Sequence, residues 1–279
     1  MYYFYVLAKR LTLIFPRVFC YRIAKCIAVL KFYFSRKERE ALMYNLSAII
    51  PDAKEAKRVA REVFINFAYY LVDFFRYEKL DKRFIEKYVT VSGLEYLPQP
   101  LDGNKGVLTV TAHLGNYELA GAITSLLGYT VHAVALPHKD QRINELFNRQ
   151  RKMVGIHIIP AGVTVRKCVS LLREPTVVAF LGDRDFFGGG LEITMMGHRV
   201  RLPKGPAFFA LKTGACIVPA FLVREKRIFY RLIFEAPIDI QGQKLTSEEM
   251  VLEAYAKVLE KYLKKYPQQW YLFTKYWLE

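Results

Sequence analysis

His113 and Glu118 are the two residues of this sequence whose types and spacing could do chemistry. A histidine can take up a proton near neutral pH, and a carboxylate within reach of its ring can hold that ring in one tautomer. The two residues lie five positions apart across a predicted strand-to-helix boundary. We therefore predict a general base with an orienting carboxylate, the arrangement that activates a nucleophile.

The segments around this pair predict how it is positioned. The apolar, β-branched run 107–111 indicates a buried strand, and Gly115 and Asn116 give a start signal for a helix that reaches about residue 127. His113 then follows a strand at its carboxyl end, where open α/β sheets bind ligands. The alternatives are a histidine satisfied within the core and a glutamate that only stabilises the helix dipole. Spacing alone leaves these alternatives open.

The rest of the chain predicts an α/β fold with a mixed sheet flanked by helices and an N-terminal amphipathic helical appendage. Residues 37–80 are expected to be helical, with an amphipathic helix after Pro51. Further strands are predicted at 130–136, 156–159, 176–181, one between 191 and 203 followed by a loop, 216–223 and 229–234, the last two as a hairpin. Further helices are predicted at 141–154, 163–173, from about 204, and at 247–265.

Residues 1–36 mix aromatic and aliphatic residues with Lys and Arg, and they contain no acidic residue. After the first eight residues, no uncharged run comes close to the roughly 20 apolar residues that a transmembrane helix needs, and no signal-peptide cleavage site is clear. We predict one or two amphipathic helices, broken near Pro16, that lie in the plane of an anionic membrane. The alternative is a buried helical hairpin whose Lys and Arg side chains extend outward.

A formal net charge of +16 implies an anionic partner, which could be nucleic acid, anionic lipid or an acidic carrier protein. Nucleic acid is disfavoured because the positive charge gathers with apolar aromatic residues at the N-terminus, and no recognised binding motif occurs. The four cysteines lack the spacing of a zinc site or a disulfide framework. We expect no metal site, and structural or surface positions for the remaining histidines, His132, His138, His157 and His198.

Four blocks in order carry a resemblance to a known family. The first is His113 with Glu118, and the second is the Arg-rich segment 148–155, which ends in glycine. The third is Asp-Arg-Asp at 183–185 with glycines up to Gly190, and the fourth is Leu-Pro-x-Gly-Pro-Ala at 202–207 with Thr-Gly-Ala-x-Ile-x-Pro at 213–219. Over about residues 38–278 the chain resembles the lauroyl and myristoyl acyltransferases of bacterial lipid A biosynthesis, in the lysophospholipid acyltransferase superfamily. The mycobacterial phosphatidylinositol mannoside acyltransferases are a sibling branch.

The resemblance implies a glycerolphosphate-acyltransferase-like fold and an O-acyltransferase. A fatty acyl chain would pass from an acyl carrier protein or coenzyme A thioester to a hydroxyl of a membrane glycolipid, with a lipid A precursor as the leading acceptor and no cofactor. His113 would be the general base, and Glu118 would hold its ring. Backbone N–H groups at Gly115 and Asn116 would stabilise the oxyanion.

Substrate-binding roles are also implied for eight residues. Arginine and lysine suit the anionic groups of donor and acceptor, and the residues near 183–192 follow a strand at the expected ligand crevice. The candidates are Asn116, Arg149, Arg151, Asp183, Arg184, Asp185, Glu192 and Lys204.

The resemblance further implies a peripheral protein on the cytoplasmic face of the bacterial inner membrane, with residues 1–36 at the membrane interface and 37–279 as the acyltransferase domain. One alternative is an acyltransferase for phosphatidylinositol mannosides or another phospholipid or glycolipid. A second, of a different class, is a non-catalytic basic protein that binds membranes.

Overall fold

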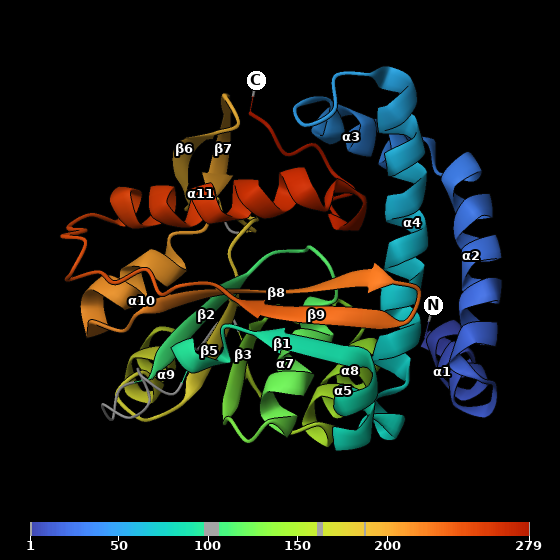
Figure 1. The fold of residues 1–279 in the computed structure, drawn as a ribbon, viewed down its shortest axis with the longest axis horizontal. Helices are drawn as coiled ribbons and strands as arrows, with labels where there is room; N and C mark the ends of the chain where they lie inside the picture. The colour runs from blue at the N-terminus through green and yellow to red at the C-terminus, as the bar shows by residue number, and fades with distance from the viewer. Residues whose placement is uncertain (1, 98–105, 161–163, 187, 279) are drawn as a thin grey trace.

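A mixed seven-stranded sheet lies at the centre of the molecule, with helices on both faces (Figure 1). The computed structural model describes residues 2–97, 106–160, 164–186 and 188–278. The strand order is β1-β9-β8-β2-β5-β3-β4, and neighbouring strands are parallel except for β8 and β9. These two form the predicted hairpin, and the predicted α/β class with a mixed sheet is confirmed.

The central strands of this sheet are mostly buried, whereas its outer strands are partly exposed. In chain order they are β1 (Val89–Ser92), β2 (Val107–Thr111), β3 (Val131–Ala135), β4 (Ile156–Pro160), β5 (Val177–Leu181), β8 (Ile217–Lys226) and β9 (Phe229–Phe234). Alternate residues of β2 point to opposite faces, so that Leu108 and Val110 enter one hydrophobic core and Val107 enters the other. A continuous apolar run is what such a doubly covered strand requires.

Among the described residues after β2, five helices cover the sheet, and three of them begin at a side-chain cap. They are α7 (Tyr117–Leu126), α8 (Gln141–Met153), α9 (Thr164–Leu171), α10 (Gly205–Thr213) and α11 (Glu248–Lys265), with short 3₁₀ turns η1 (Tyr77–Lys79), η2 (Leu94–Tyr96) and η4 (Pro267–Gln269). Asn116, Asp140 and Ser247 cap α7, α8 and α11 by accepting backbone N–H bonds. The predicted start of the α9 helix at Val163 lies outside the described residues.

One element differs from its prediction. The segment expected to be a strand and a loop is a two-stranded hairpin, β6 (Leu191–Met195) and β7 (His198–Leu202). Met196 and Gly197 both have positive φ, at 52° and 78°. That conformation fits the tight two-residue turns that join antiparallel strands, and a methionine in it gives little signal in the sequence.

The N-terminal part is a set of helices beside the end of the sheet at which β8 ends (Figure 1). They are α1 (Tyr2–Ile14), α2 (Arg17–Phe34), α3 (Arg36–Ser47), α4 (Ala53–Phe75) and α5 (Lys82–Tyr88). The break between α1 and α2 falls at Pro16, as predicted. Helix α2 packs along α4, where Tyr21 meets Tyr69 and Phe32 meets Phe64, so the two helices run in opposite directions.

The opposite face of α1 and α2 exposes apolar side chains at helical spacing. We call this face the apolar stripe. It comprises Tyr3, Phe4, Leu7, Leu11, Ile14, Phe15, Val18, Phe19, Ile23, Ile27, Leu30, Tyr33 and Phe34. The region is thus neither a fully buried hairpin nor a free helix, because one face packs on α4 while the other is uncovered. Among the described residues, no helix is both long enough and apolar enough to cross a membrane.

Candidate active site

The turn between β2 and α7 carries His113, where the sequence predicted it. Gly115 has a φ of +67°, and its N–H donates to the carbonyl of Gln269 at 2.9 Å. The N–H of Asn116 donates to Leu222 O at 2.8 Å, and that of Tyr271 donates to His113 O at 2.7 Å. The turn is therefore fixed by β8 on one side and by the C-terminal segment on the other.

Asp183 holds His113 through two hydrogen bonds. The ring Nδ1 lies 2.8 Å from Asp183 Oδ1, and the backbone N–H of His113 donates to Asp183 Oδ2 at 2.9 Å. Asp183 is fully buried and follows β5, the neighbour of β2. Because parallel neighbours end at the same edge of a sheet, the two residues meet although they are 70 positions apart. A protonated Nδ1 that donates to Asp183 leaves Nε2 as the atom that can accept a proton.

Glu118 has a different partner from the one predicted. Its carboxylate accepts hydrogen bonds from Arg151 on α8, with Nη2 at 2.5 Å and Nε at 3.0 Å. Both side chains are mostly buried, at 12% and 10% exposed. Burial opposes the charge of Arg151, but the Glu118 carboxylate outweighs it and raises the pKa of Arg151 above its ordinary value. The expectation that Glu118 orients the His113 ring was wrong, because the first turn of α7 directs Glu118 to α8.

The predicted oxyanion donors are also engaged elsewhere. The backbone N–H groups of Gly115 and Asn116 were expected to face the reacting thioester, but they donate to Gln269 and Leu222. Each N–H supplies one hydrogen, so neither group is available to an oxyanion in this structure.

A cavity of about 530 Å³ opens at His113, which we call the acyl cavity. Its inner part lies between α7 and the sheet and is lined by small or apolar side chains, among them Ala120, Gly121, Ala133, Ile156, Ala179 and Ala220. Its outer part is polar and is lined by His113, Glu118, Arg151, Arg184, Asp185 and Lys204. A narrow apolar interior with charged groups at its mouth suits a ligand with a hydrocarbon chain and an anionic end.

Comparison with known proteins identifies the family. A model described as bacterial lipid A biosynthesis acyltransferase matches residues 1–279. The chain belongs to this family. It is therefore an O-acyltransferase, as predicted.

Relatives come from both branches that the sequence resembles. A phosphatidylinositol mannoside acyltransferase of Mycolicibacterium smegmatis is 23% identical over 247 residues, which cover 86% of this chain and 79% of the relative. One of Mycobacterium tuberculosis is 24% identical over 255 residues, which cover 88% and 79%. A lipid A biosynthesis palmitoleoyltransferase of Escherichia coli is 24% identical over 258 residues, which cover 91% and 82%.

The predicted substrate-binding residues of this acyltransferase lie in three kinds of position. Arg151, Arg184, Asp185 and Lys204 line the acyl cavity. Asn116 and Asp183 are buried behind it, at 2% and 0% exposed. Arg149 and Glu192 lie outside its lining and are exposed, and Glu192 pairs with Arg199 and Arg201 across the β6–β7 hairpin.

Two aromatic residues beside His113 went unnoticed in the sequence. Tyr117 packs edge-on against the His113 ring, with ring centroids 5.4 Å apart, and Phe186 lies 6.0 Å from it. The guanidinium of Arg184 stacks over Phe186 at 4.5 Å. Tyr117 directly precedes Glu118, and Phe186 directly follows Asp185, which was the available signal.

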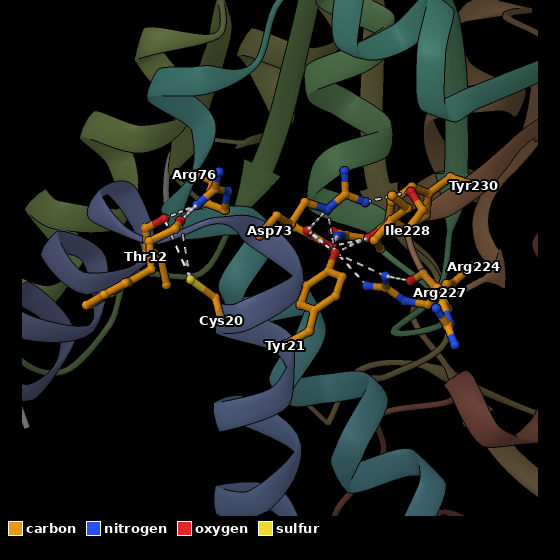
Figure 2. Close-up of polar contacts among 12 residues, drawn as sticks. Thr12, Cys20, Tyr21, Asp73, Arg76, Arg224, Arg227, Ile228 and Tyr230 are labelled. Carbon is orange, nitrogen blue, oxygen red and sulfur yellow. Dashed lines mark hydrogen bonds and ion pairs between the residues drawn. The ribbon is translucent and has the colours of Figure 1, made fainter.

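A buried polar cluster around Asp73 of α4 also escaped prediction (Figure 2). The Asp73 carboxylate accepts hydrogen bonds from Tyr21 of α2, Tyr230 of β9, and Arg224 of β8, the last at 2.9 Å. It also accepts from the side-chain amide of Asn116 at 3.2 Å. The cluster therefore joins helix α2 to the turn that carries His113. A lone acid within the apolar run 71–75 was its sequence signal.

Proposed function

We propose that this chain transfers a fatty acyl chain from an acyl carrier protein or coenzyme A thioester to a hydroxyl of a lipid A precursor, with His113 as general base and Asp183 as its orienting partner. The observation that carries the proposal is the contact between the His113 ring and the fully buried Asp183 at the mouth of the acyl cavity.

The reaction needs no protein nucleophile, because the thioester is already activated. Nε2 of His113 removes the proton of the acceptor hydroxyl as its oxygen attacks the thioester carbonyl. Asp183 stabilises the imidazolium that forms, and it holds Nδ1–H so that Nε2 faces the acceptor. The C–S bond then breaks, and the imidazolium returns the proton to the thiolate. The ester and the free thiol are the products.

The acyl cavity supplies the binding sites. The acyl chain would lie between α7 and the sheet, where Ala120, Gly121 and Ala179 leave space. Arg184 and Lys204 would bind phosphate groups of the acceptor or of the donor's phosphopantetheine arm, since both line the outer part and carry a positive charge. Glu118 and Arg151 would form a fixed part of the cavity wall, because each neutralises the charge of the other.

Membrane association is the remaining part of the proposal. The apolar stripe on α1 and α2 would enter the interface, and Arg10, Arg22 and Lys25, which are exposed on the same two helices, would face anionic headgroups. The catalytic face would then meet its lipid acceptor without leaving the membrane surface.

A transfer assay followed by mass spectrometry tests the function. Purified protein receives acyl-carrier-protein and acyl-coenzyme A donors of several chain lengths, with a tetra-acylated lipid A precursor as acceptor. We expect a mass gain of one acyl group that is lost in His113→Ala. A His113→Ala variant that keeps most of the activity would refute the assignment of the base.

A second acceptor, phosphatidylinositol mannoside, is favoured by the two mycobacterial relatives, which are named as acyltransferases for it and are 23% and 24% identical to this chain. The same assay with this acceptor separates the two possibilities. A gain on the mannoside and none on the lipid A precursor would replace the acceptor and leave the chemistry unchanged.

A further inference from the structure

A second cavity, of about 460 Å³, opens where α1 and α2 meet at Pro16. We call it the corner cavity. It shares no lining residue with the acyl cavity. Its walls come from the start of α2, the end of α4 with η1, and helix α5.

The lining of the corner cavity is rich in basic side chains. Five basic residues, Arg17, Arg76, Lys79, Arg83 and Lys87, contribute to it, against two acids, Asp73 and Asp81. A site with this excess of positive charge attracts anions.

Asp73 belongs to the polar cluster described above, and three more of these charged side chains also have structural partners. Arg76 donates to the carbonyls of Thr12 and Phe15, at the end of α1 (Figure 2), and Lys79 donates to that of Leu13. Asp81 caps α5 by accepting from the N–H of Phe84. Arg83 and Lys87 are exposed, and among the described residues no carboxylate forms an ion pair with either of them.

Arg17 lies deeper in the cavity, with its side chain 11% exposed. Its Nε donates to Tyr21 at 2.9 Å, and its Nη2 donates to the carbonyl of Ile228 at 2.6 Å. Its Nη1 is buried and has no hydrogen-bond partner among the described residues. Burial opposes the charge, but the Asp73 carboxylate together with Tyr21 and Tyr230 outweighs burial and raises the pKa of Arg17 above its ordinary value. A buried charged donor without an acceptor is costly, and an anion in the cavity would remove that cost.

We propose that the corner cavity binds the phosphate group of an anionic membrane phospholipid. Arg17 would donate Nη1–H to a phosphate oxygen, and Arg83 and Lys87 would neutralise its charge from the rim. Exposed Ile14, Phe15 and Val18 lie at the same corner, where they would contact the acyl chains of the lipid. These apolar neighbours favour a lipid over free phosphate. The lipid assignment rests on the proposed membrane association, whereas phosphate binding itself does not.

Binding to vesicles tests the proposal without any acyl transfer. Full-length protein is sedimented with phosphatidylcholine vesicles that contain or lack phosphatidylglycerol, and inorganic phosphate is titrated separately. The variants are Arg83→Ser with Lys87→Ser, and Arg17→Lys, which keeps the charge beside Asp73 but removes the guanidinium fork. The matched control is Lys212→Ser with Lys257→Ser, which removes two exposed charges from α10 and α11, helices that contribute no residue to the lining of the corner cavity.

We expect the Arg83/Lys87 variant to lose about 30-fold in affinity for phosphatidylglycerol vesicles. Arg17→Lys should also bind them less tightly, and the control should bind like the parent protein. An equal loss in the control would overturn the proposal in favour of net charge. Binding of inorganic phosphate that both variants lose, with unchanged vesicle binding, would overturn the lipid assignment.

The acyl-transfer assay in detergent keeps this result separate from the proposed function. The Arg83/Lys87 variant should retain its transfer rate there, because neither residue lines the acyl cavity. If the parent protein transferred no acyl chain but the vesicle results were as expected, the proposed reaction alone would fail.

Discussion

Asp183 is the residue on which the orientation of His113 depends. It is fully buried and binds both the ring and the backbone of His113. We expect Asp183→Asn to lower kcat by about 10²- to 10⁴-fold with a smaller change in KM, because an amide can hold the wrong tautomer. Combining it with His113→Ala should add almost nothing, since the two residues act as one unit. Retained activity in Asp183→Asn, with activity lost in a well-folded Glu118→Gln, would return the orienting role to Glu118.

Glu118 and Arg151 are instead expected to matter for stability. Replacing one member of a mostly buried ion pair leaves the other charge without a partner. Glu118→Gln should therefore lower the free energy of unfolding by about 3 kcal/mol, measured by urea denaturation. The double variant Glu118→Gln with Arg151→Met should recover much of that loss, because it leaves no unpaired charge. Equal stability of Glu118→Gln and the parent protein would contradict this role.

At the scale of elements, the turn between β2 and α7 requires glycine at position 115. A Cβ there would lie 2.0 Å from the carbonyl oxygen of Leu222, and φ is +67°. Gly115→Ala should lower both the melting temperature and kcat, because the turn must move away from β8. Gly128→Ala is the matched control, since its φ of +104° imposes backbone strain while no atom lies within 4 Å of the added Cβ. That strain alone costs about 1–2 kcal/mol, and a similar loss in both variants would refute the steric argument.

The packing of α7 on the sheet sets the space for the acyl chain. Gly121 lines the acyl cavity, and a Cβ there would lie 3.3 Å from Cδ1 of Ile156. Gly121→Leu should fill the inner part and shift the preference towards shorter acyl donors, with the rate on those donors kept. Gly121→Ala is the control and should change the profile little. The donor panel measures both, and an unchanged chain-length profile in Gly121→Leu would show that the acyl chain binds elsewhere.

The same elements show how far the sequence could predict the site. Local signals were enough for the strand before His113, the cap at Asn116 and the helix that carries Glu118, since each depends on neighbouring residues. The partner of His113 depends on β2 and β5 lying side by side, which no spacing within one segment specifies. The same holds for Asp73, whose partners come from α2, β8, β9 and the catalytic turn.

At the scale of the whole molecule, helix α4 connects the proposed membrane-binding helices to the site of catalysis. Helix α2 packs on one side of α4, and its Tyr21 donates to Asp73 near the end of α4 (Figure 2). Asp73 also accepts from Asn116 in the turn that carries His113. If membrane association is as proposed, the end of the molecule that carries the apolar stripe of α1 and α2 would both face the membrane and support the site. The net charge of +16 would bring the protein to an anionic surface, and the apolar stripe would hold it there.

The apolar stripe should therefore dominate binding at high salt. The triple variant Ile23→Ser, Ile27→Ser and Leu30→Ser removes exposed apolar side chains from one face of α2, at 46%, 52% and 59% exposed. We expect it to bind anionic vesicles at least about a hundredfold less tightly, with a nearly unchanged melting temperature, because none of these half-exposed side chains belongs to a hydrophobic core of the described residues. Phe229→Ser with Met250→Ser is the control, as both residues are exposed outside the stripe. Added salt should weaken the parent protein only in part, since it screens the basic residues and leaves apolar burial intact. If salt alone released the parent protein completely from the vesicles, the basic residues would account for the binding, and the apolar stripe would have another role.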